Sequence, residues 1–167
     1  MTGLDEAFRD GWAEGQEKPL PPKGMSCLVH CPVAAMGSKK GFVVKGRAIV
    51  VDDNPKKLRS FQAELRVAMH EVKPEKIHLG PIQVTMIFWL PRPKGHYGTG
   101  KNAGKLKGSA PGRPITKPDV DKVQRAILDV GTGLWFKDDS QVVDARVMKQ
   151  YVAEGEEERV WIEAKCL

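Results

Sequence analysis

The distribution of apolar residues along the chain predicts a set of β-strands. Residues 25–33 form an apolar run rich in β-prone side chains, and residues 82–90 place apolar side chains on both faces of an extended segment, which is typical of a strand covered on both sides. Further strands are predicted at 142–151 and 159–164. Residues 42–51 contain a Lys-Gly pair between two short β-prone runs, and this pattern predicts a hairpin with a tight turn.

A repeat of apolar residues every three or four positions predicts two helices. Asn54 and Pro55 suit the N-cap and first turn of a helix that runs to about His70, and a second helix is expected from Asp119 to about Val130. The order of strands, helix, strand, helix and strands predicts an α+β fold, a mixed β-sheet with two main helices packed on it. The apolar faces are formed by Leu58, Phe61, Leu65, Ala68 and Val72 in the first helix and by Val120, Val123, Ile127 and Val130 in the second.

The length of 167 residues suits one compact domain with a short appendage. Residues 1–24 are polar, carry an excess of acidic side chains and end in a proline-rich segment, so we expect a flexible N-terminal arm followed by one domain at 25–167. No stretch approaches 18 consecutive apolar residues, and the N-terminus lacks the apolar core of a signal peptide. These features argue against a membrane span and predict a cytoplasmic protein.

Three cysteines, an odd number, indicate a reducing compartment rather than a disulfide framework. Cys27, His30 and Cys31 lie close together in the sequence and are residue types that bind zinc. No second cysteine or histidine pair completes a set of four ligands. An apolar strand that happens to contain two cysteines is therefore the preferred interpretation.

The net charge is +6, and the basic residues gather in two segments. Residues 91–118 hold seven lysines and arginines and no acidic residue, and residues 39–47 hold four more. A basic segment rich in glycine and proline can be a solvated linker, as the acidic run at 154–158 is expected to be a solvated turn. It can also contact nucleic-acid phosphates, with His96 and Tyr97 stacking on bases or packing beside sugars. The candidate nucleic-acid contacts are Lys39, Lys40, Arg47, Lys94, Lys101, Lys105, Lys107, Arg113, Lys117 and Lys122.

Five aspartates follow the longer basic segment in the sequence, between residues 119 and 139. Helix capping and the helix dipole explain an acidic residue at Asp119 or Asp121 and stabilise by up to about 1 kcal/mol, but they do not explain the whole group. If the second helix and the following strand pack side by side, the carboxylates converge, and a divalent cation between them offsets their repulsion. Carboxylate oxygens without cysteine or histidine favour Mg²⁺ or Mn²⁺ over zinc. The group consists of Asp119, Asp121, Asp129, Asp138 and Asp139.

Arg125 lies four residues after Asp121 on the second predicted helix. It can pair with Asp121 or Asp129 as an ordinary surface salt bridge, or it can stabilise the charge of a reacting phosphate, and the spacing does not decide between these roles. A metal pocket inside a basic surface suits phosphodiester hydrolysis, because basic groups hold the backbone while the cation activates water and neutralises developing charge.

The chain contains Lys117-Pro118-Asp119-Val120-Asp121-Lys122-Val123-Gln124-Arg125-Ala126-Ile127-Leu128-Asp129, followed by Leu134-Trp135-Phe136-Lys137-Asp138-Asp139-Ser140-Gln141-Val142-Val143. These segments resemble the RusA family of Holliday-junction resolvases, which are often encoded by prophages. The family pattern has an Asp-x-Asp-Asn motif, a basic residue four positions after the second Asp, and a later Asp-Asp-x-Gln-Val motif. Residues 37–40 and 91–94 are also similar to family segments, and the resemblance covers about residues 26–165.

The resemblance implies a RusA-like fold and a homodimeric, Mg²⁺-dependent endonuclease that nicks branched DNA symmetrically in recombination and repair. Mn²⁺ is expected to substitute for Mg²⁺, and no small-molecule cofactor is expected. A two-fold symmetric dimer presents two identical sites, one for each opposed strand of a four-way junction. The family's metal-binding carboxylates fall on Asp119, Asp121 and Asp139, with Asp138 adjacent, and its catalytic lysine falls on Arg125, so the implied catalytic set is Asp119, Asp121, Arg125 and Asp139.

The chain departs from the family pattern in three places. Lys122 stands where the family often has asparagine, and Val130-Gly131 stands where it often has Ala-Leu, a difference in packing. Arg125 keeps the charge of the family's lysine, but arginine stays protonated and so does not act as a general acid. Electrostatic stabilisation survives this exchange, whereas proton donation does not.

Two functions of other classes are alternatives. A protein that binds branched DNA without cutting it would keep the basic segments and lack a metal site, and the intact aspartates argue against it. A regulatory domain that uses residues 91–118 to hold RNA or an acidic protein would tolerate the loss of Asp119 and Asp139.

Overall fold

The structure, a computed structural model, describes residues 25–37, 39–52 and 55–167. The N-terminal arm expected at 1–24 and the N-cap expected at Asn54 lie outside the described residues. No helix within these ranges is both long and apolar enough to cross a lipid bilayer.

A four-stranded mixed sheet forms the centre of the molecule. Its strands are β1 (Met25–His30), β4 (Ile82–Leu90), β5 (Val142–Tyr151) and β6 (Arg159–Cys166). They lie in the order β1-β6-β4-β5, with β4 and β5 parallel and the other neighbours antiparallel. The predicted limits of β4 and β5 are confirmed.

The first strand is shorter than the apolar run predicts. It ends at His30, where the chain bends, although Val33 and Ala34 are still buried in the core. An apolar run in the sequence indicates that its residues are buried. Here burial continues beyond His30, where strand pairing stops.

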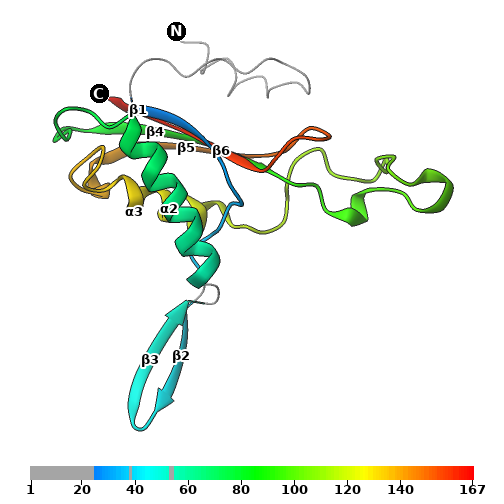
Figure 1. Cartoon of the computed structure of the whole chain (residues 1–167), viewed down its shortest axis with the longest axis horizontal. Helices are drawn as coiled ribbons and strands as arrows, with labels where there is room; N and C mark the ends of the chain where they lie inside the picture. Colours follow the sequence, from blue (N-terminus) through cyan, green and yellow to red (C-terminus); the bar gives the residue numbers. More distant parts are fainter. Residues whose placement is uncertain (1–24, 38, 53–54) are drawn as a thin grey trace.

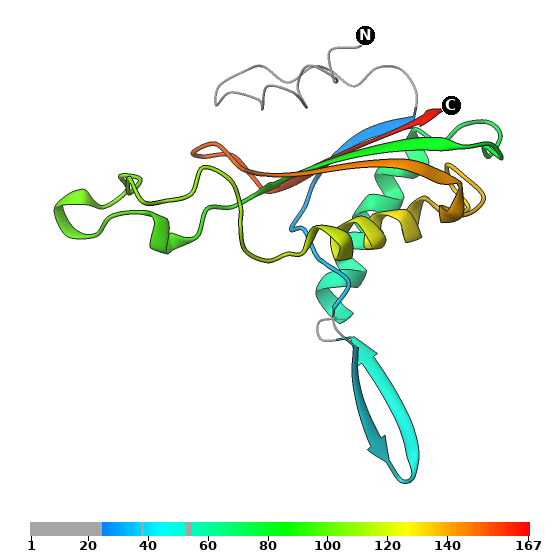
Figure 2. The same cartoon turned by 180° about the vertical axis from the view of Figure 1, so that it is seen from behind.

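Both predicted helices, α2 (Pro55–Glu71) and α3 (Val120–Gly131), lie on one face of the sheet, as Figures 1 and 2 show from opposite sides. The helix α2 packs against α3 and β1, and the predicted α+β fold with two helices on a mixed sheet is confirmed. The shared core contains Phe61, Leu65, Phe88, Val123, Ile127 and the fully buried Trp135. On α2 the last buried residue is Met69, while the predicted Ala68 and Val72 are only partly buried.

The strand β4 is buried on both faces, as its pattern predicts. Met86 and Phe88 belong to the core beneath the helices. Ile87 points the other way and packs with Met148 and Trp161 in a second apolar cluster.

The connection between the parallel strands determines where the ends of α3 lie. A chain that leaves β4 and enters the parallel β5 must return along the sheet first, and α3 makes this return. At the carboxyl end of the two strands, Lys149 of β5 donates from Nζ to the carbonyl oxygens of Thr116 and Pro118 at 2.8 and 3.1 Å, just before α3 begins. At the opposite end, residues that follow α3 lead into β5 through the short 3₁₀ helix η3 (Asp139–Gln141).

The predicted hairpin is present as a separate two-stranded sheet of β2 (Lys39–Val44) and β3 (Arg47–Asp52). Lys45 and Gly46 form its turn, with φ of 47° and 74°, the left-handed pair that a two-residue hairpin loop requires. The hairpin extends away from the sheet and helices (Figure 1).

Candidate active site

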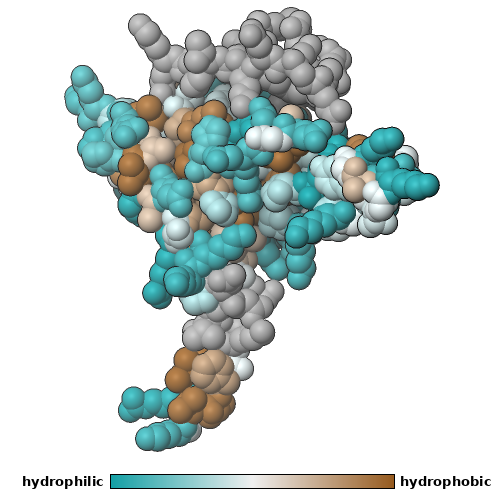
Figure 3. Space-filling model, turned by 45° about the vertical axis from the view of Figure 1, so that its right-hand side comes forward, coloured by the Kyte–Doolittle hydropathy of each residue, from teal (hydrophilic) through white to brown (hydrophobic). Residues whose placement is uncertain are grey.

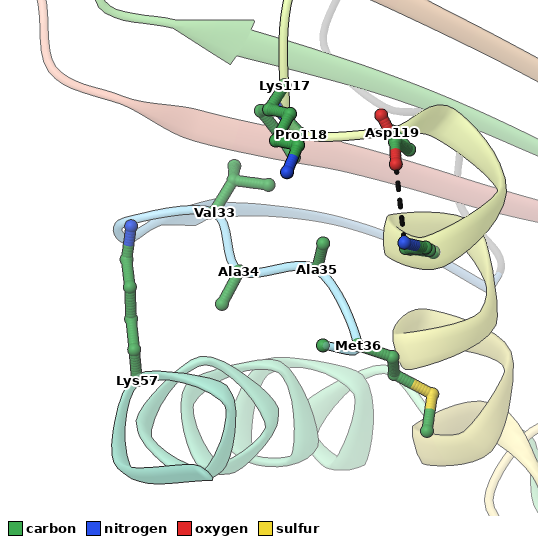
Figure 4. A pocket seen from close by; sticks show the side chains of 10 residues that line it. Val33, Ala34, Ala35, Met36, Lys57, Lys117, Pro118 and Asp119 are labelled. Carbon is green, nitrogen blue, oxygen red and sulfur yellow. Dashed lines mark ion pairs between the residues drawn. The ribbon is translucent and has the colours of Figure 1, made fainter. Parts of the chain in front are cut away.

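A pocket of about 430 Å³ lies where the start of α3 meets the segment after β1 and the first turn of α2 (Figure 4). The backbone N–H of Met36 donates to the carbonyl oxygen of Lys122 at 3.2 Å and holds that segment against α3. Among the residues that the structure describes, the pocket lining includes one carboxylate and three lysines. Its lining consists of Val33, Ala34, Ala35, Met36, Gly37, Lys57, Lys117, Pro118, Asp119 and Lys122.

Asp119 supplies the carboxylate of this pocket. It occupies the N-cap position of α3 with extended backbone angles, yet its side chain makes no capping hydrogen bond. Instead, its Oδ2 lies 3.4 Å from Nζ of Lys122, as Figure 4 shows. Helix capping therefore does not account for the Asp119 side chain, which is directed towards a cationic pocket.

Asp121 and Arg125 follow on the first two turns of α3, and both are exposed. Among the residues that the structure describes, no ion pair joins Arg125 to Asp121 or to Asp129. The surface salt bridge that the sequence allowed is thus not formed. The remaining interpretation of Arg125, a positive charge presented to a ligand, is compatible with its exposure.

Asp138 has a local structural role. Its carboxylate accepts a hydrogen bond from the backbone N–H of Ser140 at 2.9 Å, and the Gln141 side chain accepts one from the backbone N–H of Asp138 at 2.9 Å, which together form a capping box for η3. Hydrogen bonds from the side chain and backbone of Ser140 lower the pKa of Asp138. Gln141 also donates to the carbonyl oxygens of His78 and Gly80, so the Asp-Asp-x-Gln motif folds this turn and leaves Asp139 exposed on it.

The four candidate metal ligands lie in two separate pairs. Asp119 and Asp121 are at the beginning of α3, whereas Asp138 and Asp139 follow its end and precede β5. A helix of 12 residues is about 18 Å long. Among the described residues, no group of three or more histidines, cysteines, aspartates or glutamates lies close enough to hold a metal ion.

The expected convergence of these carboxylates within one subunit is therefore wrong. The helix and the strand do pack side by side, as expected, but they run in opposite directions. Asp138 and Asp139, which lie between the end of α3 and the start of β5, are therefore far from the residues at the start of α3. The donor chemistry of each pair still fits a hard cation, since all the atoms are carboxylate oxygens.

The basic segment 91–118 is an ordered extension rather than a structureless linker. It contains two short 3₁₀ helices, η1 (Lys94–His96) and η2 (Gly100–Asn102), and its two arms are joined by backbone hydrogen bonds between Gly98 and Lys105 and between Lys107 and His96. It projects from the end of β4 (Figure 2). Six of the predicted nucleic-acid contacts are exposed along it: Lys94, Lys101, Lys105, Lys107, Arg113 and Lys117.

Tyr151 at the end of β5 anchors this extension. The His96 ring packs edge-on against Tyr151 with ring centroids 5.6 Å apart. The guanidinium of Arg92 lies 4.3 Å from the centre of the same ring and also donates to the carbonyl oxygen of Pro111 at 3.1 Å. His96 is thus engaged in holding the loop, whereas Tyr97 makes no such stacking contact among the described residues.

The other predicted contacts fall in two places. Arg47 is exposed on the hairpin, and Lys122 lines the pocket. The side chains of Lys39 and Lys40 lie outside the described part of the structure. Lys57 joins the pocket from α2, and the sequence analysis missed it because a lysine on a helix gives no sign of what it will meet in space.

Glu158 supports the pocket wall from the turn between β5 and β6. Its Oε1 accepts a hydrogen bond from the backbone N–H of Val33 at 2.8 Å. Burial raises its pKa, while the Val33 hydrogen bond and the charge of Lys57 lower it and leave a net increase. The expectation of a purely solvated acidic turn is thus wrong for Glu158.

Two of the three cysteines belong to the apolar core. Cys27 and Cys31 are buried, and burial raises the pKa of each thiol to about 12. They pack in the apolar core, as the preferred interpretation of the sequence predicts.

Comparison with known proteins adds two findings. Residues 32–164 match the family model described as endodeoxyribonuclease RusA. The chain is also 34% identical over 140 residues to the uncharacterized protein YqaN of Bacillus subtilis (strain 168), an alignment that covers 81% of this chain and 94% of that protein. The matched residues include the pocket, the hairpin, the basic extension and all five aspartates of the candidate group.

Proposed function

Because the chain belongs to the RusA family of endodeoxyribonucleases, we propose that it is a metal-dependent, structure-selective endonuclease that resolves Holliday junctions by paired nicks. The main observation behind this proposal is the environment of the Asp119 side chain. Its carboxylate is not used to cap its helix and shares a pocket with Lys57, Lys117 and Lys122. An acidic group surrounded by cations suits a site where a phosphodiester and a cation meet.

The proposed cation is Mg²⁺, with Mn²⁺ as a substitute. Asp119 and Asp121 are the proposed ligands at the start of α3, because carboxylate oxygens are what these hard cations prefer. When bound, the cation supplies an activated water molecule and neutralises charge on the phosphate. The lysines of the pocket hold the DNA backbone beside it.

Arg125 is proposed to stabilise the negative charge that develops on the cleaved phosphate. It lies one helical turn after Asp121 and is exposed, so both side chains can face the same ligand. Arginine remains protonated at any pH of interest. Proton transfer to the leaving oxygen is then a task for solvent rather than for Arg125.

A homodimer is proposed because one subunit does not bring its aspartates together. Asp139 lies at the opposite end of α3 from Asp119 and Asp121. Two copies related by a two-fold axis, with their α3 helices antiparallel, would place the Asp139 end of one beside the Asp121 end of the other, twice, by symmetry. Such a dimer has two identical sites, which matches paired cleavage of a four-way junction.

The test is cleavage of a synthetic four-way junction, compared with a linear duplex of the same sequence, in Mg²⁺ and in EDTA. We expect nicks only in the junction and only with Mg²⁺. The Asp121→Asn protein should lose at least about a hundredfold in nicking rate, since even residues that merely support metal ligands cost up to that much. Its junction binding should be equal or tighter, because a negative charge near phosphate is removed.

The matched control is Asp129→Asn, an exposed aspartate later on the same helix, which should cut at the wild-type rate. Undiminished cleavage by Asp121→Asn would refute the site assignment. Tight, selective junction binding by the wild type without any cleavage would instead favour the alternative, a catalytically inactive protein that binds branched DNA.

A further inference from the structure

The hairpin β2–β3 exposes apolar side chains far from any core. Phe42 is 47% exposed, Val43 72%, Val44 44% and Ile49 39%. Figure 3 shows hydrophobic side chains gathered on the projecting hairpin, beside hydrophilic side chains. Contiguous apolar side chains on a protein surface mark a site that something covers.

Within the described part of the chain, the strands of the hairpin contact chiefly each other. An isolated two-stranded hairpin is marginally stable in water. Phe42 and Ile49 face each other across the strands and so form one small apolar face. Burial of this face against a ligand would stabilise both the hairpin and the complex.

The charge of the hairpin favours nucleic acid over protein as the ligand. All four charged residues between 39 and 51 are basic. Lys45 stands in the turn and Arg47 directly after it, and both are exposed. The one acidic residue of the two strands, Asp52, is the last residue of β3, at the end of the hairpin opposite its turn. Apolar side chains beside the cations of the turn suit a surface whose base faces are apolar and whose edges are phosphates.

The hairpin also begins beside the candidate active site. The backbone hydrogen bond between Met36 and Lys122 lies three residues before β2, and Met36 and Gly37 line the same pocket as Asp119. A strand of six residues spans about 20 Å. The tip can therefore reach well inside a DNA structure whose phosphate is held at the pocket, since a major groove is only about 8.5 Å deep.

We propose that the β2–β3 hairpin enters the branch point of the DNA substrate and is the element that distinguishes branched from linear DNA, an inference that rests on the proposed function. Phe42 and Ile49 contact base faces at the branch point, and Lys45 and Arg47 contact the adjoining phosphates. Stacking at a branch point is not held by a continuous duplex on both sides, so a base face can be exposed there at a lower cost than within a linear duplex.

The test uses the full-length protein in Ca²⁺, which allows binding to be measured separately from cleavage. The double substitution Phe42→Ala with Ile49→Ala should weaken junction binding at least about tenfold, since burial of the Phe42 ring alone accounts for about that much. Binding to a linear duplex should stay within about twofold, because the basic residues that supply it remain. The single substitution Phe42→Trp should keep the junction preference, since tryptophan also stacks on bases.

The matched control is Val67→Ala with Leu79→Ala, which removes two apolar side chains that are even more exposed, 63% and 74%, from α2 and from the loop before β4. This protein should bind the junction like the wild type. A second measurement uses 2-aminopurine in the junction. Its fluorescence should rise on wild-type binding when the base is at the branch point and not when it is in an arm, since only the branch-point base loses its stacking.

These experiments distinguish a failure of the proposed function from a failure of the hairpin inference. Wild-type protein that neither prefers nor cuts junctions would overturn the proposed function and this inference with it. If the wild type cuts junctions but the Phe42/Ile49 double variant keeps its full preference, the hairpin inference alone is overturned. A double variant that sediments as a smaller species than the wild type would also overturn it, because the hairpin would then be an interface between protein chains.

Discussion

Asp119 and Asp138 carry the same side chain at the same kind of position, the N-cap of a helical segment. Asp138 accepts the capping hydrogen bond from Ser140, whereas Asp119 makes no capping bond and lies beside Lys122. Residue type and position favour capping at both places. What differs is the three-dimensional surroundings, and these separate a structural aspartate from a candidate catalytic one.

Glu158 gives a pH-dependent prediction at the same scale. Its folded-state pKa is raised above the ordinary value of 4.5, chiefly by burial. A raised pKa means that this group contributes most stability below pH 4.5 and that the contribution is lost as pH rises through the folded-state pKa. The Glu158→Gln protein keeps an acceptor for Val33 and cannot ionise, so its stability relative to the wild type should be greater at pH 7 than at pH 4.

The measurement is the urea midpoint of both proteins at the two pH values. Glu157→Gln, at the exposed neighbouring position, serves as the control and should differ from the wild type by a constant amount. A Glu158→Gln difference that is constant or larger at pH 4 would show that burial does not dominate at this side chain.

At the scale of elements, the end of α3 depends on a glycine. A Cβ atom at Gly131 would lie 2.7 Å from Cζ of Phe136 and 3.2 Å from the terminal methyl of Met69. Both neighbours are fully buried. The Val130-Gly131 pair, seen in the sequence as a packing difference, allows the buried Phe136 ring to lie against the helix.

The substitution Gly131→Ala should therefore destabilise the protein by about 1–3 kcal/mol, the usual cost of overpacking a core. Alanine within a helix would otherwise stabilise by about 0.5–1 kcal/mol, so the sign of the change tests the contact. Gly112→Ala, at an exposed site with nothing within 4 Å of the added atom, is the control for thermal or urea unfolding. An increase in stability for Gly131→Ala would contradict this packing.

The basic extension makes a prediction of its own. Replacement of Lys101, Lys105 and Lys107 by glutamine should weaken DNA binding and reduce the slope of log affinity against log salt by about 0.9 for each phosphate that the protein no longer neutralises. The control removes three charges elsewhere, with Arg66, Lys73 and Lys76 each changed to glutamine. An unchanged slope in the first protein would mean that the extension does not touch phosphate.

At the scale of the whole molecule, the antiparallel course of α3 and β5 divides the candidate site between two ends. This division predicts complementation between subunits. The Asp121→Asn and Asp139→Asn proteins should each be inactive alone, yet a refolded mixture should regain nicking. In a mixed dimer with a shared site, both substitutions fall in one site and the other site is intact.

The measurement is junction nicking by the mixed dimer, which should reach about half of the wild-type rate for single nicks by this count of intact sites. Refolding each variant alone is the control. If the mixture remains as inactive as its components, then each site is built within one subunit or Asp139 takes no part in cleavage.

Much of this molecule was predictable because its signals are local. The alternation in β4, the Lys-Gly turn of the hairpin and the three-four spacing in α3 each depend on residues within a few positions of one another. The family motif is local too, since it comprises two adjacent segments. Other features depend on tertiary contacts that no pattern in the sequence predicts. Examples are the place of Lys57 in the pocket, the hydrogen bond between Val33 and Glu158, and the packing of Phe136 on Gly131.

The sequence by itself determined the strands, the two helices, the mixed sheet and the membership of a nuclease family. Periodicity and turn chemistry act over short distances, so these features need no knowledge of the remaining chain. Only the tertiary structure decided which aspartates share a surface. That depends on the direction in which α3 returns along the sheet, and this direction follows from the parallel pairing of β4 with β5.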